Sequence, residues 1–178
     1  MTTGTPAQHR DRCGLDRLRE RKGPDMRRTY QVLAWLISGL VVVQAAAIAF
    51  AMAGVVNFVD GGGVIDKALV ESEDMAFPEV TGFIIHGING GMVIPIVALL
   101  LMGVSFGAKF PGARKWAGIV LGLVALQMFL GYGLYGAAAL GVLHGANALL
   151  VFGGSAYAGR LAGAARTQTD SADAMVSA

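Results

Sequence analysis

The pattern His-Gly-x-Asn occurs twice in apolar surroundings, at His86–Asn89 and at His144–Asn147. A histidine in such a run is costly unless its ring nitrogens bind something. Imidazole is a standard axial ligand of haem iron and also binds other metal ions. A lone intramembrane histidine would more often belong to a structural hydrogen-bond network. The matched pair instead indicates one ligand site that takes an imidazole from each copy.

Other polar and small residues accompany the two histidines. Each Asn follows its His at i+3 and therefore shares roughly the same face of a helix. The glycine after each His removes side-chain bulk beside the ring. Two glutamines in the preceding apolar spans could hold the second imidazole nitrogen and fix which nitrogen faces inward. The candidate cofactor-binding residues are His86, His144, Asn89, Asn147, Gln44, Gln127, Gly87 and Gly145.

Three interpretations of these residues stay open. The first is one b-type haem, with His86 and His144 as ligands of the iron, for electron transfer or haem handling. The second is a non-catalytic membrane scaffold or accessory subunit whose buried His, Gln and Asn residues are a structural hydrogen-bond network. The third is a small metal ion, or a proton or solute path. Two histidines alone fill only part of the coordination of a bare metal ion. The spans carry no relay of charged residues that a proton or solute path would need.

The composition indicates an integral membrane protein. Of the 178 residues, 54% are hydrophobic and 15% charged, and the mean hydropathy is +0.58. Several apolar runs exceed the roughly 18–20 residues that cross a ~30 Å hydrocarbon core. The basic N-terminal segment interleaves acids with its arginines and lacks aromatic residues, so no nucleic-acid partner is expected. The single cysteine, Cys13, can form neither an internal disulfide nor a multi-cysteine metal site.

The hydrophobic pattern predicts an all-α fold, a four-helix transmembrane bundle, because an open strand edge in lipid would leave backbone groups unpaired. Pro95 is expected to kink the second span. Trp116, Tyr132 and Tyr135 are expected to be anchors at the membrane interfaces. The predicted spans cover residues 30–56, 78–106, 115–134 and 137–157, within a transmembrane domain at 29–162 that has an outer loop at 57–77. Disordered tails are predicted at 1–28 and 163–178.

The two halves of the transmembrane domain resemble each other. Span one contains GLVVVQ and span three GLVALQ, while span two contains IIHGINGGMVI and span four VLHGANALLVF. A glutamine span followed by a histidine span therefore occurs twice. This order predicts two tandem two-helix repeats related by a pseudo-two-fold axis along the membrane normal. Both histidines should then lie at one depth, roughly 10–12 Å below the outer boundary.

Longer stretches carry two resemblances. RTYQVLAWLISGLVVVQAAAIAF, GFIIHGINGGMVIPIVALLL and LGLVALQMFLGYG…LHGANAL resemble an uncharacterised family of small four-helix bacterial membrane proteins, which implies a fold and no activity. The chain is also distantly similar to one four-helix half of haem A synthase. This second resemblance implies that His86 and His144 occupy the places of a bis-histidine pair.

The sequence departs from haem A synthase at one catalytic position. In that enzyme a Glu stands three residues before the first histidine of the substrate-binding half. Here the position is Phe83, and the equivalent position before His144 is Gly141. The resemblance therefore implies haem binding without haem modification, and an enzymatic role is not expected.

Basic residues are divided unequally between the two sides of the predicted bundle. The loop between spans one and two carries only Lys67, and the other thirteen Lys and Arg residues lie in the termini and the loop between spans two and three. Both termini should therefore be cytoplasmic. The expected location is the bacterial inner membrane, as a multi-pass protein within the lipid bilayer. A redox or respiratory-chain protein is the partner that the haem interpretation would require.

Reporter fusions test this orientation. A reporter fused after Ala164 should be active only in the cytoplasm, and one inserted within residues 60–75 only outside, because the basic residues favour the cytoplasmic side. The reverse pattern would overturn the orientation and, with it, the expected depth of the histidines.

Overall fold

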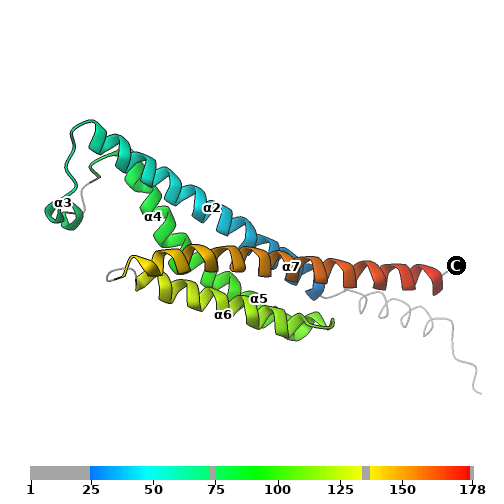
Figure 1. The fold of residues 1–178 in the computed structure, drawn as a ribbon. Coiled ribbons are helices and arrows are strands. Elements are labelled where there is room, and N and C mark those ends of the chain that lie inside the picture. Colours follow the sequence, from blue (N-terminus) through cyan, green and yellow to red (C-terminus); the bar gives the residue numbers. More distant parts are fainter. Residues whose placement is uncertain (1–24, 73–74, 134–136, 177–178) are drawn as a thin grey trace, which may run out of the picture.

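Four apolar helices form the membrane part of the protein (Figure 1). The computed structural model describes residues 25–72, 75–133 and 137–176, and this part of the chain contains no strand. The elements are α2 (Met26–Asp60), α3 (Lys67–Glu71), η1 (Pro78–Val80), α4 (Thr81–Ile88), η2 (Asn89–Val93), α5 (Ile94–Ala108), α6 (Ala113–Tyr132) and α7 (Ala139–Val176). The stretches long and apolar enough to cross a membrane are Met26–Asp60, Pro78–Ala108, Ala113–Tyr132 and Ala139–Gln168.

Local chemistry fixes where two of the helices begin. Asp25 precedes α2, and its side chain accepts hydrogen bonds from the backbone N–H groups of Arg27 and Arg28. These are donors that the first turn of a helix leaves without partners. Lys109 and Gly112 both have positive φ angles, of 49° and 86°, in the short connection between α5 and α6. Glycine adopts this backbone conformation without steric cost, which allows so short a loop.

The helices pack as a four-membered bundle with two diagonals. α2 packs against α5 and α7, and α6 packs against the same two helices. α2 and α6 therefore face each other across the bundle, as do α5 and α7. α4, which continues α5 outward, packs against α2 and has no comparable contact with α6 or α7. The pair α2 and α4 thus diverges from the pair α6 and α7 at one end (Figure 1).

At the end of the bundle away from this divergence, hydrogen bonds join α2 to α6 and α7. The Tyr30 hydroxyl, fully buried in α2, donates to the Ala113 carbonyl of α6 at 3.0 Å. The Ser38 and Ser155 hydroxyls of α2 and α7 lie 2.7 Å apart. Such interhelical bonds contribute about 0.6–2 kcal/mol each in membrane bundles. The hydrophobic core surrounds them, so the closed end of the bundle carries its tightest packing.

The last helix is longer than its composition predicts. Residues 163–176, predicted to be disordered, continue α7 as far as Val176. One reason is that the Arg27 guanidinium donates a hydrogen bond to the Ala165 carbonyl at 3.3 Å, which ties this part of α7 to the start of α2. The first helix also runs four residues into the predicted outer loop, to Asp60. The predicted N-terminal tail up to residue 24 lies outside the described residues.

A single π-helical turn interrupts the second span. In η2 the Ile94 N–H bonds to the Asn89 carbonyl, five residues back, and Pro95 follows at once. Proline has no N–H and clashes with the carbonyl four residues before it, which favours a local widening of the helix. The kink expected from Pro95 therefore takes the form of a π-turn at Asn89–Val93, between α4 and α5.

Close packing of α2 against α7 can be tested at Gly159. A Cβ there would lie 2.9 Å from the Trp35 indole nitrogen, whereas a Cβ at Gly153 of the same helix would meet no atom within 4 Å. Gly159→Ala should lower the free energy of unfolding by about 1–3 kcal/mol because of overpacking. Gly153→Ala should be neutral or stabilising by up to about 1 kcal/mol, since Ala is the better helix former. Thermal unfolding in detergent measures both, and equal stabilities would contradict the close contact.

Candidate functional site

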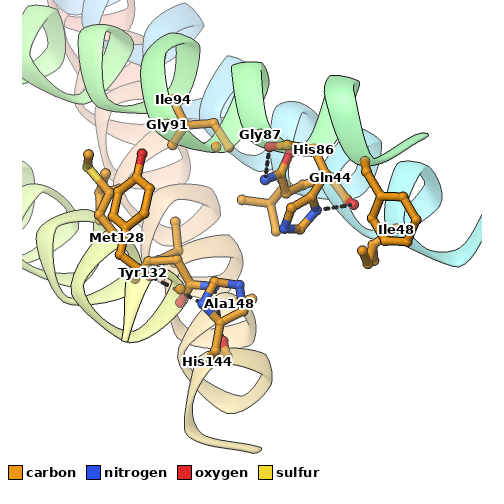
Figure 2. A pocket seen from close by; sticks show the side chains of 17 residues that line it. Gln44, Ile48, His86, Gly87, Gly91, Ile94, Met128, Tyr132, His144 and Ala148 are labelled. Atoms are coloured by element: carbon orange, nitrogen blue, oxygen red, sulfur yellow. Dashed lines mark hydrogen bonds between the residues drawn. The ribbon is translucent and has the colours of Figure 1, made fainter. Parts of the chain in front are cut away.

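A cavity of about 400 Å³ lies among the four membrane helices where the two helix pairs diverge (Figure 2). This volume falls within the roughly 300–1,000 Å³ of small-molecule sites. The lining is mostly apolar or glycine, and none of its side chains is an acid, lysine or arginine. Its polar side chains are those of Gln44, His86, Gln127, Tyr132 and His144.

Gln44 of α2 binds the start of the second span through a set of hydrogen bonds. Its Nε2 donates to the His86 backbone carbonyl at 2.7 Å, and its Oε1 accepts from Asn89 Nδ2 at 2.9 Å. Asn89 Nδ2 also donates to the Leu40 carbonyl at 2.9 Å. His86 Nδ1 lies 3.2 Å from the Gln44 carbonyl oxygen. We call Gln44, His86 and Asn89 the first cradle.

The second hairpin repeats this arrangement bond for bond. Gln127 Nε2 donates to the His144 carbonyl at 3.0 Å, and Gln127 Oε1 accepts from Asn147 Nδ2 at 2.7 Å. Asn147 Nδ2 also donates to the Leu123 carbonyl at 2.9 Å, and His144 Nδ1 lies 3.2 Å from the Gln127 carbonyl oxygen. Gln127, His144 and Asn147 form the second cradle. Each of these hydrogen bonds of the first cradle therefore has a counterpart in the second.

Each cradle fixes the tautomer of its histidine. A carbonyl oxygen can only accept, so Nδ1 of both rings must carry the proton that it donates to the glutamine carbonyl. A ring that carries only this proton has a lone pair on Nε2. No residue in the described part of the chain forms a hydrogen bond with either Nε2. The cradles thus present two free lone-pair nitrogens at the surface of one cavity.

The two imidazole rings lie close together across the bundle. Their centroids are 6.2 Å apart and their planes are inclined by 50°. Figure 2 shows His86 and His144 approaching the cavity from α4 and α7.

Glycines give the cavity part of its room. A Cβ at Gly131 would come within 3.0 Å of His144 Cε1, and one at Gly90 would overlap the Gln44 side chain. A Cβ at Gly87, in contrast, would meet no atom within 4 Å. Gly90 and Gly131 are therefore required for packing of the cradles, whereas Gly87 borders open space.

Comparisons with known protein families, curated proteins and solved structures find no match to this chain. The described residues also contain no group of three or more His, Cys, Asp or Glu side chains that could hold a metal ion. What the site can bind therefore has to be argued from its own geometry.

The candidate residues from the sequence divide into two groups. His86, His144, Gln44, Gln127 and Gly87 line the cavity. Asn89, Asn147 and Gly145 do not line it. The two asparagines are 6% and 4% exposed and brace the glutamines from behind. Gln44 and Gln127 each bind one nitrogen of a histidine ring, as expected, and the atom that does so is the backbone carbonyl oxygen.

Tyr132 is a cavity residue that the sequence reasoning missed. It was expected to be an interface anchor, yet a Cβ at Gly91 would lie 2.9 Å from its hydroxyl, and both residues line the cavity. An anchoring tyrosine directs its hydroxyl to the membrane boundary, whereas this one is directed at the middle of the second span. Its position one turn after Met128, which also lines the cavity, is a helical spacing that could have indicated it.

The equivalence of the cradles predicts equal costs for equal substitutions. Asn89→Leu and Asn147→Leu each remove two hydrogen bonds and leave a glutamine Oε1 without the donor that it has in the cradle. Each should lower the free energy of unfolding by about 1–3 kcal/mol. Asn57→Leu is the control, because Asn57 is exposed near the end of α2. Denaturant titration of the three variants in detergent measures the cost, and a loss in only one cradle would contradict the equivalence.

Proposed function

We propose that this protein binds one b-type haem in the bacterial inner membrane, with His86 and His144 as the two axial ligands, for electron transfer or haem handling. The observation that carries the proposal is the 6.2 Å between the ring centroids. Metal–imidazole bonds are about 2.0–2.1 Å long, so rings at this separation are close enough for His86 and His144 to hold one iron between them.

The donor set suits haem better than a bare metal ion. Two histidines fill only part of the coordination of a bare ion, and no third His, Cys, Asp or Glu joins them among the described residues. Haem brings four nitrogens of its own and needs only axial ligands from the protein. The cavity also offers apolar walls and glycine surfaces to a flat macrocycle.

The haem periphery sets a constraint on the pose. No lysine or arginine lines the cavity, so no cationic partner for the propionates lies within it. The propionates would therefore have to leave through the open end, where α4 has no comparable contact with α6 or α7. A haem placed so would keep its apolar edge toward the buried Ile94, Val124 and Val151.

The residues of the cradles would prepare the site before any ligand enters. The Gln44 and Gln127 carbonyls hold both Nδ1–H groups, so neither ring has to rotate or change tautomer to present Nε2. A carbonyl partner on Nδ1 also raises the basicity of Nε2 as a ligand. When bound, a bis-histidine haem would supply a one-electron couple with both axial positions filled. An acid three residues before either histidine, needed for haem modification by analogy with haem A synthase, is absent from the sequence.

We further propose that the two hairpins are tandem repeats with both termini in the cytoplasm. The paired cradles support the repeat, and the distribution of basic residues supports the orientation. A hairpin has two spans, so two successive copies enter the membrane in the same direction. Each copy would then contribute one imidazole to a site on their common axis.

A structural scaffold is the second candidate, and the cradles themselves favour it. They bind the side chains of both glutamines and join α2 to the second span and α6 to α7, which a scaffold also needs, although the buried Asn147 Oδ1 has no hydrogen-bond partner among the described residues. These bonds, however, run within each hairpin and not between the hairpins. A scaffold gives no role to two Nε2 atoms that share a cavity.

Absorption spectroscopy of the purified protein tests haem binding. Protein titrated with haemin and then reduced should give a sharp Soret band and split low-spin α and β bands. His86→Ala, His144→Ala and the double variant should lose this spectrum to the same extent, because a bis-histidine site acts as one unit. His9→Ala, in the N-terminal segment, is the matched control and should bind like the unsubstituted protein. Single variants that each keep half of the binding would refute a shared site. If the purified protein binds no haemin, the haem proposal is refuted and the scaffold interpretation is retained.

A further inference from the structure

A second apolar groove lies between α6 and α7 and shares no residue with the histidine cavity. It has a volume of about 400 Å³ and is lined by apolar, aromatic and glycine residues. Leu149 and Leu150 on its wall are 72% and 58% exposed, so the groove opens on the outer surface of the bundle. In a membrane this surface faces lipid chains.

The groove has an open floor and an aromatic end. A Cβ at Gly153, which lines the groove, would meet no atom within 4 Å. The rings of Trp116 and Tyr157 lie 4.4 Å apart and join the two helices at one end. The shape is therefore a slot for a narrow apolar chain, closed by the residue types that favour the head-group level of a bilayer.

Two cations stand at the aromatic end of the slot. Lys115 directly precedes Trp116, and Arg160 follows Tyr157 at i+3 on the same face of α7. Both side chains are exposed, and neither forms an ion pair or hydrogen bond with any residue that the structure describes. Lys115 also lies in the first turn of α6, where the helix dipole disfavours a positive charge. The preference of basic residues for the cytoplasmic side of a membrane also favours cations at this end of the helices.

The corresponding surface of the first hairpin lacks all these features. Matching the cradles places Gln44 with Gln127, and the cavity walls match Ile94 with Val151. On this alignment the positions of Lys115, Trp116, Gly153, Tyr157 and Arg160 correspond to Val32, Leu33, Ile96, Leu100 and Gly103. The matching positions of the first hairpin thus carry neither the aromatic pair nor the two cations. These features belong to the second hairpin alone.

We infer that this groove binds one anionic phospholipid. Lys115 and Arg160 hold its phosphate, Trp116 and Tyr157 contact its glycerol region, and one acyl chain runs over Gly153. Basic pockets beside membrane helices recognise anionic head groups in this way, and each nearby cation contributes about 1 kcal/mol. The site is independent of the histidine cavity and of whether haem binds.

Native mass spectrometry of the protein in detergent, with phosphatidylglycerol or phosphatidylcholine of the same acyl chains added, tests this site. The unsubstituted protein should bind one phosphatidylglycerol about 30-fold more tightly than phosphatidylcholine, as two cations predict. Lys115→Gln with Arg160→Gln should abolish the preference.

A substitution that fills the groove tests the contribution of the groove to lipid binding separately from that of the two cations. Gly153→Ile introduces the residue type found at the matching position of the first hairpin, Ile96, and should abolish binding of both lipids. Circular dichroism should show that the variant keeps its helix content. Gly118→Ile is the control, because Gly118 also has no atom within 4 Å of a Cβ but lies on α6 outside the groove. Equal affinity for the two lipids, or binding unchanged by Gly153→Ile, would overturn the proposal.

Discussion

A buried amide inside a membrane has to satisfy its donors and acceptors within the protein, and the rest of this bundle depends on how Gln44 and Gln127 do so. Each side chain bridges a histidine carbonyl and an asparagine amide on the next helix. This pair of bonds fixes both the rotation and the depth of that helix. The histidine ring, held in turn by the glutamine carbonyl, therefore has one orientation available.

The second span departs from the symmetry of the cradles at one place. His86 and Asn89 match His144 and Asn147 without a gap, but beyond η2 the match moves by one residue, so that Ile94 takes the place of Val151 at the cavity wall. A π-turn accommodates one extra residue in this way, and such turns are frequent at functional sites. Gly90 and Gly91 lie in this turn, against Gln44 and Tyr132. The cavity therefore has two histidines held in equivalent ways but unequal walls.

Sequence patterns predicted what depends on residue type and spacing. Four apolar spans and the pairing of Gln with His follow from hydropathy and repetition. Three features depend on tertiary contacts and could not be derived. The helical end of α7 involves Arg27, the π-turn needs Pro95 in the geometry of this bundle, and the direction of the Tyr132 hydroxyl depends on where α5 passes α6. The partner residues of the rings could be predicted, but the spacing does not show whether the side-chain amide or the backbone carbonyl of the glutamine makes the bond.

The two ends of the bundle differ in whether hydrogen bonds join one hairpin to the other. At the closed end, Tyr30 reaches Ala113 and Ser38 reaches Ser155, so polar bonds hold one hairpin to the other. At the histidine level the cradle bonds run only within hairpins, and α4 has no comparable contact with α6 or α7. The hairpins can therefore separate there without breaking a cradle. Among the described residues, the polar bonds that join the hairpins lie at the closed end, and none of them crosses the space between the two histidine rings.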